Sequence, residues 1–255
     1  KEFSERCCFP DSPFEIPDEG VNGSVKLGVN ESGIPFGFDS ENELHILIVG
    51  EPGTGKSTLA NFIIAPQLMD QGIKVWFLVK SRDIQNLMKL RNDIVNVDFG
   101  QNGKAKINLK QSPPNVSKAK WESLFFDAFC QSEALYDGTK NHLIKLSSEL
   151  NEEYEKFGVE PSLFELHDYI QARHKDFPKG SRRYYFCESA LNRLSGILTG
   201  PMCNSLDCSS GCLEKLVNEN TIFNIGGLPA TQQVFVVNTL TSFLFNYKEN
   251  NICNE

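Results

Sequence analysis

The sequence predicts an α/β fold, in which a parallel β-sheet forms the core and a helical subdomain is inserted into it. Two continuous apolar runs, at 44–49 and 74–79, are typical of strands buried on both faces. A glycine-rich loop and a helical pattern separate these runs, which indicates a βαβ unit. We therefore predict four parts: an N-terminal arm with a β-hairpin lead-in, the first half of the core, a helical insertion, and a return to the core sheet, at 1–40, 41–116, 117–200 and 201–255.

Composition places the chain among globular proteins and narrows its partners. The 255 residues are 40% apolar, which is enough for a packed interior. A net charge of −8 argues against a surface that coats nucleic acid over its whole area, but it leaves room for a local basic groove. No apolar stretch approaches the roughly 18 residues of a membrane span, and no secretory leader opens the chain. We expect a soluble, cytoplasmic protein and, because residue 1 is Lys, either a processed form or a piece of a longer protein.

The eight cysteines are scattered rather than arranged as a secreted disulfide framework, so we predict mostly reduced thiols. Cys203, Cys208 and Cys212 are close enough together for a metal or a disulfide. Their spacing lacks the CxxC pair of structural zinc sites, and no His lies nearby. We favour thiols over a metal there.

The lead-in contains a β-hairpin candidate. Residues 1–20 are rich in Pro and acidic side chains and show no period, which indicates an arm or a remnant of a preceding domain. The short runs at 24–29 and 34–38 flank the turn-forming cluster at 30–33. This order predicts two strands joined by a tight connection.

The core elements follow the hairpin. The run at 44–49 predicts a buried central strand, and the residues at 58–68 predict the helix after it. A second buried strand is expected at 74–79. Strand character returns at 221–225, and a helix is predicted from 231 to 247.

The helical insertion carries three apolar stripes at helical spacing, and core packing explains each of them. The stripes are Leu143, Leu146, Leu150, Tyr154 and Phe157; Leu163, Leu166 and Ile170; and Leu191, Leu194 and Leu198.

The glycine-rich loop matches the pattern GxxxxGK[ST], in which backbone N–H groups surround a phosphate. Glycine lets the chain curl closely, and the helix that follows favours an anion at its start. The lysine places a positive charge on the β- and γ-phosphates, and the next hydroxyl ligates Mg²⁺. The predicted ATP and Mg²⁺ contacts are Gly50, Glu51, Pro52, Gly53, Thr54, Gly55, Lys56, Ser57 and Thr58, with Lys56 and Ser57 in the catalytic roles. The competing interpretation is a glycine turn with a solvated lysine.

ATP is favoured over GTP because the sequence downstream of the loop has no Asn/Thr-Lys-x-Asp element of the kind that guanine-specific proteins use.

These features resemble the HerA and FtsK branch of P-loop motor ATPases, including the conjugative type IV secretion ATPases. The segment His45–Ser57 is similar to the family's "HILIVGEPGTGKS" start, and Ile107–Leu109 to its "iNPL" segment. Ser189–Leu194 is similar to its "sl.rL" helix, and Asn220–Leu228 to the strand before its last motor helix. The resemblance covers about Ser24 to Tyr247, and only the loop is highly specific.

The resemblance implies a P-loop NTPase of the RecA-like, additional-strand type. It implies an ATPase that forms a hexameric ring and couples ATP hydrolysis to translocation of DNA or protein. The family's strand ending in Asp-Glu is missing, because the only such pair is Asp18-Glu19. We expect that strand to begin just after Glu255, and hence MgATP binding with near-background hydrolysis by the chain as given. The family's second strand ends in an aspartate, whereas Val79–Asp83 here has no assigned role.

Two other functions remain open. One is a regulatory module in which ATP orders an interface, and the other is a small-molecule kinase. Arg182, Arg183 and Arg193 are candidate lid arginines or arginine fingers, or simply exposed side chains. Glu51 and Asp83 are the alternative catalytic carboxylates.

Overall fold

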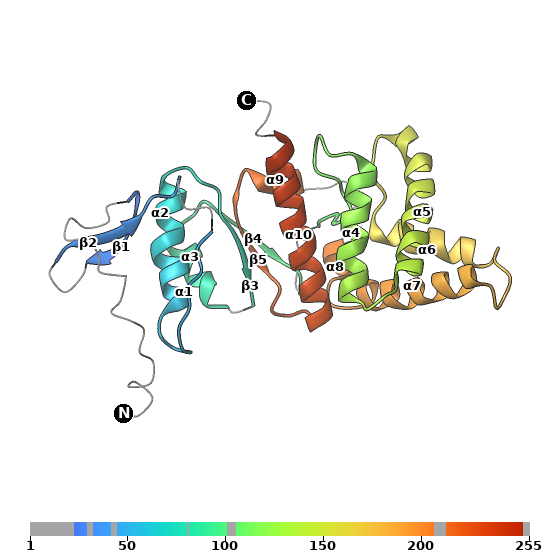
Figure 1. The fold of residues 1–255 in the computed structure, drawn as a ribbon, viewed down its shortest axis with the longest axis horizontal. Coiled ribbons are helices and arrows are strands. Elements are labelled where there is room, and N and C mark those ends of the chain that lie inside the picture. The colour runs from blue at the N-terminus through green and yellow to red at the C-terminus, as the bar shows by residue number, and fades with distance from the viewer. Residues whose placement is uncertain are drawn as a thin grey trace, which may run out of the picture. The chain divides into compact units, whose positions relative to one another are not determined.

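The computed structural model of this chain describes residues 23–29, 33–41, 45–80, 82–100, 106–206 and 213–251 (Figure 1). It divides into two compact units, Lys1–Val75 and Trp76–Glu255. A parallel sheet with flanking helices confirms the predicted α/β class. Among the described residues, no helix is both long enough and apolar enough to cross a membrane. The four-part division of the sequence stays a prediction.

The first unit begins with the predicted β-hairpin. Strand β1 (Val25–Val29) pairs with β2 (Pro35–Phe38) in antiparallel register, with an irregularity between Lys26 and Gly28. Val25 is fully buried. The predicted turn at 30–33 lies outside the described residues except for Gly33, whose φ is 77°.

A continuous helical segment, here called the helical rod, follows the glycine-rich loop, and a π-helix forms its middle. It consists of α1 (Lys56–Thr58), the π-helix η1 (Leu59–Ile64) and α2 (Ala65–Asp70), which confirms the predicted helix. Pro66 explains the wide turn, because proline has no N–H and its ring clashes with the carbonyl four residues earlier. The Ala65 N–H accordingly bonds to Ala60 O, five residues back.

The predicted buried strand at 44–49 is wrong. Leu44 lies outside the described residues, and residues 45–50 form no strand. Leu47 is 88% exposed and Val49 is 79% exposed. A strand needs a neighbour that supplies a hydrogen-bond ladder, and the described strands pair only among themselves, as β1 with β2 and as β3, β5 and β4. An apolar run without such a neighbour does not form a strand.

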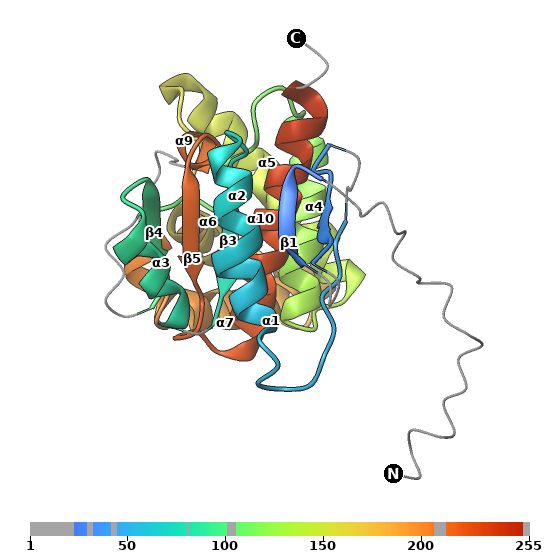
Figure 2. The same ribbon diagram turned by 90° about the vertical axis from the view of Figure 1, so that its left-hand side faces the viewer.

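The second unit is built on a three-stranded parallel sheet (Figure 2). Its order is β3 (Trp76–Val79), β5 (Asn220–Asn224) and β4 (Ile94–Asp98), so a strand far along the chain is central. Both predicted strands are confirmed, although β3 starts two residues later than predicted and β5 starts and ends one residue earlier. β4 was not predicted, although its Ile94, Val95 and Val97 are β-branched residues of the kind that strands favour. The connection from β3 to β4 contains η2 (Arg82–Ile84) and α3 (Gln85–Leu90).

A helical subdomain follows the first two strands of this sheet. Its long helices are α4 (Lys118–Ser132), α5 (Asp137–Tyr154), α6 (Leu163–His174) and α7 (Arg182–Leu198). The short elements are η3 (Glu155–Phe157), α8 (Cys203–Leu206) and α9 (Leu213–Val217). The predicted last helix is α10 (Ala230–Asn251), which packs along α4 through Trp121 against Phe243 and Phe125 against Phe235.

Serine caps set where three of these helices begin. Ser117, Ser162 and Ser181 each accept a hydrogen bond from the backbone N–H three residues later. At Ser162 the Glu165 side chain bonds back to the Ser162 N–H, which completes a capping box.

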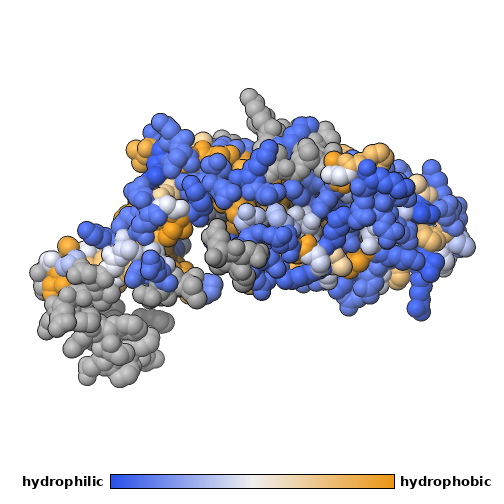
Figure 3. Space-filling model, turned by 90° about the horizontal axis from the view of Figure 1, so that it is seen from above, coloured by the Kyte–Doolittle hydropathy of each residue, from blue (hydrophilic) through white to orange (hydrophobic). Residues whose placement is uncertain are grey.

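The apolar stripes of the insertion form its core, with one exception. Leu143, Leu166 and Leu194 are at most 1% exposed. Phe157 is 74% exposed, so its predicted burial is wrong. The α-helix ends at Tyr154, and the 3₁₀ turn that follows breaks the helical spacing on which the stripe depends. Figure 3 shows mainly hydrophilic residues on the outer surface of these helices.

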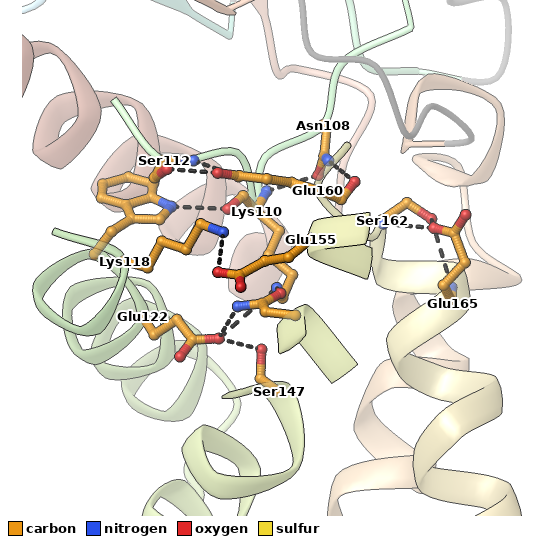
Figure 4. Close-up of polar contacts among 12 residues, drawn as sticks. Asn108, Lys110, Ser112, Lys118, Glu122, Ser147, Glu155, Glu160, Ser162 and Glu165 are labelled. Carbon is orange, nitrogen blue, oxygen red and sulfur yellow. Dashed lines mark hydrogen bonds and ion pairs between the residues drawn. The ribbon is translucent and has the colours of Figure 1, made fainter. Parts of the chain in front are cut away.

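A buried polar network fixes the segment before α4 to the helical subdomain (Figure 4). Lys110 and Glu122 have side chains only 3% and 5% exposed, and their charged atoms lie 3.8 Å apart. Lys110 Nζ donates to Asn151 Oδ1 at 2.7 Å, while Asn151 and Ser147 both donate to Glu122. Buried charges are tolerated where such partners surround them, so this network specifies one arrangement of α4 and α5.

Candidate nucleotide-binding site

The glycine-rich loop curls through two left-handed glycines. Gly53 and Gly55 have φ of 85° and 89°, a conformation that residues with a side chain rarely adopt. Between them, Thr54 closes a turn, because its N–H and its hydroxyl both donate to Glu51 O. The chain then enters α1 with Gly55 as N-cap and no side chain capping the first N–H groups. These N–H groups are therefore available to an anion at the start of the helix.

Gly50 has a different reason to be glycine. It does not have a positive φ, whereas the sequence argument assigned conformational freedom to it. A Cβ atom at Gly50 would lie 2.8 Å from Thr54 Oγ1. Glycine at this position leaves room for the Thr54 side chain, which folds back against the start of the loop.

The Lys56 side chain reaches across the loop. Its Nζ donates to Gly50 O at 2.8 Å and to Glu51 O at 2.6 Å. The ammonium group thus lies against the carbonyls at the start of the loop. A phosphate inside the loop would meet this charge directly and exchange for the two carbonyl acceptors.

The donor set also fits a magnesium ion. Ser57 is exposed, and its hydroxyl makes no hydrogen bond within the described part of the chain. Mg²⁺ takes oxygen ligands, keeps several waters and is bound together with substrate phosphates, so one hydroxyl beside the loop suits it. Thr58 is exposed on the same first turn. The roles predicted for residues 50–58 stay predictions.

Two glutamines join the helical rod to the hairpin. Gln67 pairs with the backbone of Lys26 as a strand would, accepting from its N–H at 2.7 Å and donating to its carbonyl at 2.8 Å. The Gln67 side-chain amide also donates to Ile63 O. Gln71 donates to Ser24 O at 2.9 Å and accepts from the Ser40 hydroxyl. No local pattern marks either glutamine, because their partners in and beside the hairpin are about 30 to 50 residues away along the chain.

The remaining candidate residues lie in the second unit or outside the description. Arg182, Arg183 and Arg193 are exposed on α7, and Asp83 is exposed in η2. Asp18-Glu19, Cys208 and Cys212 lie outside the described residues. Cys130, Cys187 and Cys203 are free thiols, and no cluster of three or more His, Cys, Asp or Glu side chains among the described residues suits a metal.

Comparison with solved structures identifies the architecture. The chain superposes on VirB4 of Thermoanaerobacter pseudethanolicus with a TM-score of 0.63 over 91% of its length, at 19% identity. It superposes on the bacterial conjugative coupling protein TrwBdeltaN70 with a TM-score of 0.56 over 85% of its length, at 16% identity. The chain shares the fold of these two proteins, as its resemblance to the HerA and FtsK branch led us to expect. This confirms the resemblance stated from the sequence.

The match is one of fold and not of sequence. The matched region covers 66% of the first protein and 54% of the second, so this chain spans less than two thirds of each. No family model matches the sequence, and no curated protein matches it significantly.

Proposed function

We propose that this chain is the ATP-binding module of a ring-forming motor ATPase that couples ATP hydrolysis to translocation of DNA or protein. The observation that carries the proposal is the loop itself. Gly53 and Gly55 curl the loop. Lys56, the first residue of α1, reaches back across the loop, and no side chain caps the start of this helix. The fold shared with VirB4 and the conjugative coupling protein supports the motor class.

In this proposal the backbone N–H groups of residues 53–58 hold the phosphates of ATP. Lys56 leaves the carbonyls of Gly50 and Glu51 and neutralises the β- and γ-phosphates. The Ser57 hydroxyl ligates Mg²⁺, which supplies charge stabilisation to the transferring phosphoryl group. The partners of the assembled protein are ATP, further copies of this chain in a hexamer, and the DNA or protein that is moved.

The decisive test is stabilisation by MgATP. At a hundredfold excess over the dissociation constant, binding adds about 2.7 kcal/mol to the free energy of unfolding, which raises the melting temperature by several degrees. Lys56→Ala should remove most of this shift. Lys74→Ala, which changes an exposed lysine of the same unit, should leave it unchanged.

Further readouts separate the motor from a module that only binds. In a longer protein that also supplies the family's Asp-Glu strand, phosphate release that stops in Lys56→Ala supports the ATPase, and a hexamer in light scattering with MgATP supports the ring. An unchanged MgATP shift in Lys56→Ala would refute the assignment of the loop. If that longer protein binds MgATP tightly, stays monomeric and shows no turnover, a regulatory module is favoured instead.

A further inference from the structure

A small pocket among α5, α6 and α7 lies outside the proposed nucleotide site. Its volume is about 170 Å³. Buried Leu146 forms an apolar part of its wall, and half-buried His142 and Phe177 form its aromatic part. The other lining residues are charged: Lys145, Glu149, Arg173, Asp176 and Arg183.

The Arg183 guanidinium of this pocket is available to bind a ligand. Glu149 is already engaged, because the Tyr169 hydroxyl donates to it at 3.2 Å and Arg173 and Lys145 lie within 4 Å. Asp176 is exposed. Arg183 forms no ion pair within the described part of the chain, and its guanidinium carbon lies 6.0 Å from the centroid of the Phe177 ring. Three cations against two carboxylates give a positive pocket on a chain whose net charge is −8.

His142 adds a second available donor. Its Nε2 lies 3.3 Å from Cys187 Sγ, and burial raises the pKa of that thiol to about 11. The thiol keeps its proton near pH 7 and can donate it to Nε2, and the tautomer that accepts this bond carries its ring proton on Nδ1. Burial, together with Arg183 and Lys145, lowers the pKa of His142, while Glu149 opposes the shift. The ring is thus neutral near pH 7 and can donate through Nδ1–H.

We propose that this pocket binds a small phosphate-bearing anion, held by the Arg183 guanidinium and the His142 imidazole, with Lys145 at the rim. A guanidinium presents paired N–H groups that match two phosphate oxygens. The neutral imidazole adds a third donor, and the Lys145 ammonium adds charge at the exposed edge. The pocket's volume suits a single phosphate group with a small substituent, rather than a nucleotide lying in a cleft of ordinary ligand-site size.

The test follows the titration of His142 by NMR. The chain has four histidines, and a His142→Gln variant assigns the resonance of interest. Inorganic phosphate should raise the pKa of His142 by about half a unit or more, because a bound anion favours the imidazolium. Sodium chloride at matched ionic strength controls for screening, and His167, which bonds to Ser195, serves as the internal reference.

Matched arginine variants locate the anion. Arg183→Gln should weaken phosphate binding about tenfold or more, as expected for a lost charged hydrogen bond. Arg182→Gln removes the neighbouring exposed arginine, which does not line the pocket, and should leave the affinity unchanged. Lys145→Gln should give an intermediate loss.

Four results would overturn the proposal. One is an equal shift of the His142 pKa in chloride, and another is equal phosphate affinity in the two arginine variants. The third is a shift that only ATP produces and that Lys56→Ala abolishes, because it would report the glycine-rich loop. Acetate provides the fourth test, because a site selective for phosphate should shift the pKa of His142 much less with acetate than with phosphate. An equal acetate response would count against phosphate.

Discussion

The first unit and the helical subdomain of the second unit keep their order by different means. In the helical subdomain, Leu166 and Ile170 are fully buried and the helices bury one another's apolar stripes. In the first unit, Leu47 and Val49 are largely exposed, and side-chain amides tie the hairpin to the helical rod. Buried apolar area holds the helical subdomain, whereas in the first unit directed hydrogen bonds add to a small buried set that includes Val25, Ile64 and Met69.

The contrast shows what an apolar sequence pattern can predict. A helix satisfies its own backbone groups, so an amphipathic stripe needs only an apolar partner, which the neighbouring helices supply. A strand needs a neighbouring backbone as well as an apolar environment. The same residue type, leucine, is therefore buried at position 166 and exposed at position 47.

The largest expected effect comes from truncating the same residue type in both regions. Leu166→Ala should lower the free energy of unfolding by about 2 to 5 kcal/mol, because it leaves a cavity in the core. Leu47→Ala should change it by no more than about 0.5 kcal/mol, as an exposed position does. Urea unfolding followed by circular dichroism measures both variants. Equal losses would show that residues 45–50 are buried in solution and would remove the contrast.

The next largest effect comes from the buried Lys110, and it appears as a change of the unfolding free energy with pH. Burial lowers the pKa of Lys110 from 10.5 to about 8, with Glu122 opposing the shift. Between these pH values the unfolded chain binds more protons at this lysine, so its contribution to stability rises with pH through that window. The change is at most about 3 kcal/mol.

Comparison of variants isolates this slope. The difference in unfolding free energy between the wild type and Lys110→Met should grow in favour of the wild type from about pH 8 to pH 10. Taking the difference cancels the pH dependence that the wild type and the variant share. One shared contribution comes from the thiol of Cys130: burial raises its pKa, so the folded state loses stability as pH rises above 9. Lys120→Met changes an exposed lysine of α4 and provides the control. A flat difference for Lys110→Met would mean that Lys110 is solvated.

The sequence predicts features that depend on residues nearby in the chain, and it does not predict contacts between residues that are far apart in the chain. The curled loop follows from its glycines and the helices from their stripes, since both depend on neighbours within a few residues. The pair of Lys110 and Glu122 depends on Ser147 and Asn151 of another helix, and no pattern along the chain marks it. Phe157 fails for a related reason, because the helical spacing stops where α5 stops.

The strands show the same limit. β5 is buried, and its β-branched and aromatic residues Thr221, Ile222 and Phe223 mark it as a strand, so the sequence predicts it. β4 lies at the sheet edge with a mixed pattern of exposure and was missed. Its position beside a strand more than 100 residues later is a property of the topology, and no local preference carries it.

The smallest expected effect concerns Gln67, whose side chain joins the helical rod to the hairpin of the first unit. Its three hydrogen bonds lie in an exposed setting, so Gln67→Leu should cost only about 1 to 2 kcal/mol, and that locally. The specific readout is hydrogen exchange at the Lys26 amide, which donates to Gln67 Oε1 and should lose its protection. Gln67→Glu keeps that acceptor and loses the amide donor, so it should retain part of the protection at Lys26. Gln171→Leu, at an exposed position on α6, should leave Lys26 unchanged. If Gln67→Leu left the Lys26 amide protected while amides of the helical subdomain exchanged faster, the hairpin would owe its order to burial, and the two regions would not differ in the way proposed.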